Sequence, residues 1–136
     1  MVVRVIRKSY FNAAHRLYKK EWSDEKNLEI FGKCSYPNYH GHNYILELSV
    51  IGETDPETGY VIDLKKLEMI IQDHVIEKLD HKNLNLDVPE LKGKVPTAEN
   101  IAIMIYEQIK PLFNDMGVQV TLHETNKNTA IYPANI

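Results

Sequence analysis

A strand whose alternate residues are apolar is the feature of this sequence that most constrains its fold. Side chains of a β-strand point alternately to its two faces. Every second residue from position 44 to position 50 is large and apolar, so one face of this strand has to be buried. His40 and His42 lie on the same face, which makes two imidazoles the polar end of an apolar stripe. The stripe itself consists of Tyr44, Leu46, Leu48 and Val50.

The His40-Gly41-His42 segment is the first candidate site. Residues two apart on a strand have Cα atoms about 7 Å apart, so both rings can reach one metal ion. His15 offers a third nitrogen, and three protein nitrogens with an open fourth position are typical of a catalytic zinc site. Two alternatives stay open. The histidines can be ordinary, partly exposed strand residues, and imidazole also binds copper, nickel and iron.

Composition limits the classes of function. A length of 136 residues fits one domain, spanning 1–136. The net charge of −3 gives no reason to expect a nucleic acid or an anionic membrane as partner. The single cysteine excludes an intrachain disulfide, which makes the cytoplasm the expected compartment. No apolar stretch approaches the roughly 18 residues of a membrane span.

Periodicity along the chain predicts an α+β fold in the order ββααββ. Asp63 can cap the first helix, and Pro111 should end or kink the second. Alternation and helical spacing together predict a mostly antiparallel four-stranded sheet with two helices on one face. The expected strands are 2–11, able to run on to His15, 44–51, 118–122 and 129–132, and the expected helices are 63–79 and 97–111.

Cys34 is a second candidate, because it lies in a polar connection six residues before His40. This connection, residues 17–37, is long for a compact domain, and such loops are usually functional. A helical turn is expected within it from Ser23 to Phe31. A thiol near a dication or a basic group ionises more easily and can act as a base or a ligand. The alternative is that a lone cysteine is a small buried apolar residue.

Asp80 and His81 follow the first predicted helix and form a third candidate. An adjacent acid and imidazole can orient and tune one another for proton transfer. Local context favours a simpler interpretation, since a basic residue near a helix C-terminus is stabilised by the helix dipole.

Glu124 is a fourth candidate, because it shares the face of the apolar residues of strand 118–122. A buried carboxylate needs partners, and the N–H groups of a polar heterocycle would supply them. The alternative places Glu124 just beyond the core, at the strand end. His74 and His123 are interpreted as surface or packing residues.

Six motifs in order closely resemble the 6-pyruvoyl-tetrahydropterin synthase family, over about residues 11–132. The related 6-carboxy-tetrahydropterin synthases share most of them. The six-residue step from Cys34 to His40 is more similar to the pyruvoyl branch. The motifs are Phe11-x-Ala13-x-His15-Arg16-Leu17, Phe31-Gly32-Lys33-Cys34, His40-Gly41-His42-Asn43-Tyr44, Leu79-Asp80-His81-Lys82-Asn83-Leu84, Pro96-Thr97-Ala98-Glu99-Asn100 and Glu124-Thr125.

The resemblance implies the tunnelling fold, in which three subunits join their sheets into a barrel. Two such trimers stack into a homohexamer, with sites between subunits. It also implies a role for each candidate residue. The zinc ligands would be His15, His40 and His42, the base Cys34, its proton-transfer partners Asp80 and His81, the pterin anchor Glu124, and further pterin contacts Thr97 and Glu99.

The implied substrate is 7,8-dihydroneopterin triphosphate, converted to 6-pyruvoyl-tetrahydropterin with loss of triphosphate in tetrahydrobiopterin synthesis. Zinc would act as a Lewis acid on the side-chain oxygens. Arg16 and Lys33 are the expected triphosphate contacts. One alternative is the 6-carboxy enzyme of queuosine synthesis, which releases acetaldehyde and triphosphate. Others are a dihydroneopterin aldolase or epimerase, and a non-catalytic zinc or pterin-binding module. The presence of a base argues against the last of these.

Overall fold

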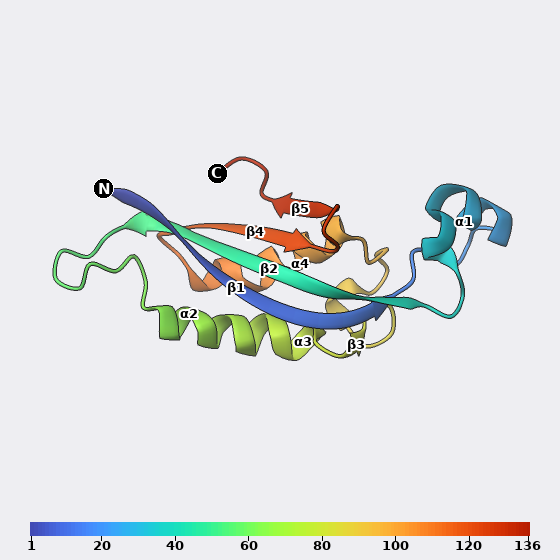
Figure 1. The fold of residues 1–136 in the computed structure, drawn as a ribbon, viewed down its shortest axis with the longest axis horizontal. Helices are drawn as coiled ribbons and strands as arrows, with labels where there is room; N and C mark the ends of the chain where they lie inside the picture. The colour runs from blue at the N-terminus through green and yellow to red at the C-terminus, as the bar shows by residue number, and fades with distance from the viewer.

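One five-stranded sheet organises all 136 residues of the computed structural model, and the chain adopts an α+β fold. Helices α2, α3 and α4 lie along one face of the sheet, while α1 projects from one end (Figure 1). The strand order is β3-β1-β2-β4-β5. The strands are β1 (Val2–His15), β2 (His40–Glu53), β3 (Lys82–Asn83), β4 (Gly117–His123) and β5 (Thr129–Tyr132).

The sheet differs from the four-stranded antiparallel sheet expected from the sequence. The four expected strands pair antiparallel, but β3 adds a fifth strand that runs parallel to β1. This strand forms because backbone N–H groups of His81 and Leu84 donate to the carbonyls of Asn12 and Ala14. A strand of two residues is too short to show side-chain alternation, so no sequence pattern indicates it.

The register between β1 and β2 brings the three histidines to one place. His15 lies opposite His40, and Ala13 lies opposite His42. Directly opposed residues of antiparallel strands project from the same face. The 14-residue pairing therefore places all three imidazoles on the face of Tyr44, at the end of the sheet nearest α1.

The helices begin and end where the sequence predicts. Asp63 and Thr97 accept hydrogen bonds from backbone N–H groups at the starts of α2 (Leu64–Ile71) and α4 (Ala98–Ile109). The first predicted helix is a continuous run of α2, a π-helical segment at 72–76, and α3 (Glu77–Leu79). Ser23 caps α1 (Asp24–Phe31), which confirms the expected helical turn. Pro111 lies in a 3₁₀ turn that ends α4.

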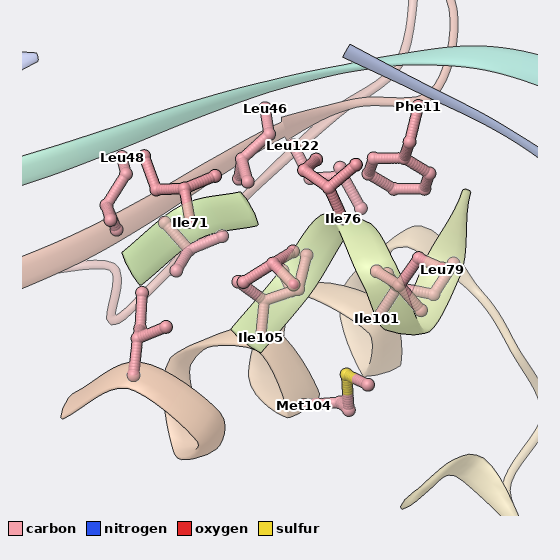
Figure 2. Close-up of a cluster of buried hydrophobic side chains, with 14 of the residues drawn as sticks. Phe11, Leu46, Leu48, Ile71, Ile76, Leu79, Ile101, Met104, Ile105 and Leu122 are labelled. Carbon is pink, nitrogen blue, oxygen red and sulfur yellow. The ribbon is translucent and has the colours of Figure 1, made fainter. Parts of the chain in front are cut away.

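The hydrophobic core fills the space between the sheet and the helices (Figure 2). Leu46, Leu48 and Leu122 extend from the sheet toward Ile71 and Ile105 on the helices. Full burial of one such side chain stabilises the fold by about 1.5–3 kcal/mol. The core continues along the face that carries the histidines, so it provides a rigid base for them.

The opposite face of the sheet has no helix over it. Tyr10 on this face is 66% exposed. His123 forms an ion pair with Glu47 and a 2.9 Å contact from Nδ1 to Thr129 Oγ1. This pair fits the interpretation of His123 as a surface residue. None of the helices has the length and apolar character needed to cross a membrane.

Candidate active site

Three imidazole nitrogens converge at the end of the β1–β2 hairpin. The ligand atoms of His15, His40 and His42 all lie within 4.8 Å of one another. Each Nε2 atom is buried and lacks a hydrogen-bond partner. A buried polar atom without a partner is costly, and three together need a common explanation. A shared cation would satisfy all three.

The protonation of His15 suits metal binding. Its Nδ1 lies 2.8 Å from the Pro96 carbonyl oxygen, which can only accept, so Nδ1 carries the proton. Nε2 therefore presents its lone pair to the cluster. Burial, followed by the charges of His40 and His42, lowers the pKa of His15 from 6.5 to about 4 despite the opposing Pro96 bond. Burial and the charge of His42 also lower the pKa of His40. Neutral imidazole is the form that binds metals.

The geometry thus fits a zinc-type ion. Three imidazole nitrogens from a rigid hairpin match the donor set of a catalytic zinc centre. The Pro96 carbonyl orients the His15 ring, as an outer partner does for a metal-binding histidine. Sequence reasoning did not find this acceptor, because a backbone carbonyl has no residue signature.

Glu124 lies next to this cluster. Its Oε2 atom is 4.0 Å from His15 Nε2, and its side chain is 16% exposed. Its backbone N–H donates to the Asn128 carbonyl at 3.0 Å, which fixes the turn into β5. Glu124 lines a pocket of about 630 Å³ together with Thr97 and Glu99. This volume is in the usual range of small-molecule sites.

Cys34 lies in a 3₁₀ turn (Gly32–Ser35) directly after α1 and is partly buried. Gly32 makes this turn possible, since its φ of 61° is one that residues with a Cβ rarely adopt. Burial first, then the charges of Glu124 and Cys34, raise the pKa of Tyr44. The buried Tyr44 hydroxyl is 3.4 Å from His15 Nδ1. The Leu17 N–H donates to the Cys34 carbonyl at 2.9 Å, which ties the Cys34 turn to the strand end that carries His15. Tyr44 is a member of the site that the sequence presented only as core.

Asp80 and His81 are paired but lie apart from this pocket. Asp80 Oδ2 is 3.0 Å from His81 Nδ1. The N–H of Asn12 donates to the other oxygen of Asp80 and is the main reason why the pKa of Asp80 is lowered. His81 has a φ of 61°, and its side chain is 81% exposed at the edge of the sheet. Neither His81 nor Cys34 lines the pocket of Glu124 within one chain.

The two cations expected to bind triphosphate also lie outside that pocket. Lys33 is exposed. Arg16 is half-buried, donates from Nε to the Ser35 carbonyl at 2.7 Å, and places its guanidinium carbon 3.8 Å from the centre of the Tyr18 ring. Part of its binding capacity is therefore used inside the chain.

Comparison with known proteins gives consistent results. Residues 4–135 match the model of the family described as 6-pyruvoyl tetrahydropterin synthase. The chain is 45% identical over 131 residues to the 6-pyruvoyl tetrahydrobiopterin synthase of Pongo abelii, covering 95% of this chain and 90% of that protein. The human enzyme of the same name is 44% identical, with the same coverage. The structure of Caenorhabditis elegans 6-pyruvoyl tetrahydropterin synthase superposes with a TM-score of 0.90 at 41% identity, covering 97% of this chain and 95% of that one.

Proposed function

Because the chain belongs to the 6-pyruvoyl tetrahydropterin synthase family, we propose that it is a zinc-dependent lyase acting on 7,8-dihydroneopterin triphosphate. The product would be 6-pyruvoyl-tetrahydropterin, with triphosphate released. The observation that carries the metal dependence is the set of three buried, unpartnered Nε2 atoms on His15, His40 and His42. The proposed pathway is tetrahydrobiopterin synthesis, as the names of the relatives suggest.

The three histidines would hold the zinc ion. When bound, zinc would supply Lewis acidity to oxygen atoms of the substrate side chain. The lowered pKa of His15 keeps its ring neutral, and the bond to the Pro96 carbonyl orients the ring. Tyr44 packs against His15 and closes the inner side of the site to solvent, since it is fully buried.

Glu124 would anchor the pterin ring. An ionised carboxylate accepts two hydrogen bonds side by side, which matches adjacent ring N–H and amino groups. The pocket supports this role because Glu124 lies at its wall and within 4.0 Å of a proposed zinc ligand. The three histidines do not line this pocket, so Glu124 is the residue that would connect a bound ring to the histidine cluster. Thr97 and Glu99 at the start of α4 would complete the ring contacts.

Cys34 would remove and return protons on the substrate side chain, with Asp80 and His81 as the transfer partners. The bond from the Leu17 N–H to the Cys34 carbonyl supports its half of this proposal, because it holds the Cys34 turn close to the chain that directly follows His15. The exposed ring of His81 supports the other half, because it is free to meet a substrate held by a neighbouring subunit. No redox cofactor is needed if side-chain oxidation and ring reduction are one internal rearrangement.

The proposed assembly is a trimer whose sheets join into a barrel, with two trimers forming a hexamer. The outer edge of β1 supports it, because β3 covers only Ala13 and Ala14 and leaves residues 2–11 without a strand partner on that side. Unpaired strand edges favour pairing with another chain. Such pairing would put sites between subunits. Lys33 remains the proposed triphosphate contact, whereas Arg16, expected in the same role from the sequence, already donates from Nε to the Ser35 carbonyl.

The test is the identity of the product. Purified protein loaded with zinc and given dihydroneopterin triphosphate should release triphosphate and form 6-pyruvoyl-tetrahydropterin, identified by mass. Stoichiometric acetaldehyde would instead identify the 6-carboxy reaction, which the names of the relatives do not favour. Binding without turnover would identify a non-catalytic pterin-binding module. A His42→Ala variant that keeps its full zinc content by elemental analysis would refute the ligand assignment.

A further inference from the structure

Arg16 connects the segments that carry the proposed catalytic groups. It directly follows His15, and Asn85 binds its backbone on both sides. The N–H of Arg16 donates to Asn85 Oδ1 at 2.8 Å, and Asn85 Nδ2 donates to the Arg16 carbonyl at 2.8 Å. Asn85 belongs to the same short stretch as His81, so the two strand-end segments are fixed relative to each other.

The side chain of Arg16 extends the connection to the loop of Cys34. Its Nε donates to the Ser35 carbonyl at 2.7 Å. The N–H of Leu17 donates to the Cys34 carbonyl at 2.9 Å. The consecutive carbonyls of Cys34 and Ser35 thus accept hydrogen bonds from the consecutive residues Leu17 and Arg16. The Tyr18 ring, 3.8 Å from the guanidinium carbon, keeps the guanidinium plane in place.

We propose that Arg16 is a positioning residue for Cys34. Through the Ser35 carbonyl it sets where the thiol lies relative to the histidine cluster, and through Asn85 it relates that loop to the Asp80–His81 segment. The inference deepens the proposed function, and it rests on Cys34 being the proton-transfer group there. It gives Arg16 a role that does not depend on contact with triphosphate.

The two roles predict different kinetics. A lost phosphate contact weakens substrate binding, so KM rises, and lysine should largely replace arginine because it binds phosphate as a point charge. A lost positioning contact misplaces the base, so kcat falls while KM changes little. Lysine should then fail, since it has neither the Nε–H nor the planar group that stacks on Tyr18.

The experiment compares Arg16→Lys and Arg16→Gln with the parent and with Lys20→Gln, an exposed cation in the same connection. All are loaded with zinc, and zinc content is measured. We expect kcat to fall at least about tenfold in both Arg16 variants and KM to stay within about threefold. Because Cys34 is the only thiol, its alkylation by iodoacetamide at fixed pH reports that site alone. We expect alkylation to be at least about threefold faster in both variants, since the turn opens more often.

A second variant covers the case in which Arg16→Gln does not fold. Asn85→Asp keeps the acceptor for the Arg16 N–H but removes the donor to its carbonyl, so it should lower kcat in the same direction by a smaller factor. The double variant with Arg16→Lys should lose less than the product of the two single losses, because both act on one connection.

Normal kcat in Arg16→Lys, or unchanged alkylation of Cys34 in the folded variants, would overturn the proposal. A raised KM with normal kcat would assign Arg16 to phosphate binding instead. If the parent makes no product, the proposed function fails, while the alkylation rates still decide whether Arg16 holds the Cys34 turn.

Discussion

The buried imidazole of His15 should make the metal-free protein sensitive to mild acid. Its pKa is about 4 in the folded chain, against 6.5 for a free side chain. Well above pH 6.5 the ring is neutral in both states and contributes no pH dependence. As the pH falls from 6.5 to about 4, the unfolded chain binds a proton that the folded chain excludes, so the free energy of unfolding decreases. The full difference corresponds to about 3 kcal/mol.

His15→Asn isolates this contribution, because an asparagine amide can still donate to the Pro96 carbonyl but does not titrate. Chelator-treated parent and variant should be unfolded with urea at fixed chain concentration from pH 8 to pH 4. Between pH 8 and pH 7 the gap between the two stabilities should be constant. Between pH 6.5 and pH 4 the parent should lose about 3 kcal/mol more than the variant. Parallel stability curves over that range would refute the reasoning.

Three further substitutions, the last with an exposed control, test other parts of the structure. Cys34→Ala should keep zinc and pterin binding but lose turnover by a factor on the order of 10² or more, measured under saturating substrate, and parental activity would make the thiol merely structural. Glu124→Gln turns an acceptor toward the pterin donors into a donor, so affinity measured by calorimetry should fall about tenfold to a hundredfold, and unchanged affinity would count against the anchor. Ile105→Ala should lower the free energy of unfolding by about 2–5 kcal/mol in urea, whereas Leu28→Ala, at a 51% exposed position, should change it by less than about 0.5 kcal/mol.

Side-chain periodicity was sufficient for most of the fold. The alternation from His40 to Val50 predicted β2, and helical spacing, with Asp63 as the expected cap of the first helix, predicted α2 and α4. These patterns work because each element buries one face, and burial selects residue type at a fixed period. Even the convergence of the three histidines follows from strand parity, once His15 is opposite His40.

Features built from backbone groups were not predictable. Strand β3 exists through N–H groups of His81 and Leu84, and the partner of His15 is the Pro96 carbonyl. Every residue has such groups, so no residue type marks them. The bond from Arg16 to Ser35 was not predictable for the same reason, because its acceptor is also a backbone carbonyl. From the sequence, Arg16 was assigned to the anionic substrate because it is a cation next to a candidate site residue.

The contact between His15 and the Pro96 carbonyl also limits where residues can be inserted into the chain or deleted from it. Thr97 begins α4, and Asn100 holds the neighbouring Val95 carbonyl at 2.8 Å, so the residues beside Pro96 cannot shift independently of the helix. Inserting or deleting one residue at 95–97 would displace either the helix start or the acceptor that orients His15. The turn at 55–60 joins β2 to the run before α2 at the opposite end of the sheet, and its residues are exposed in the single chain (Figure 1). Engineered loops, tags or inserted domains therefore belong at that far turn.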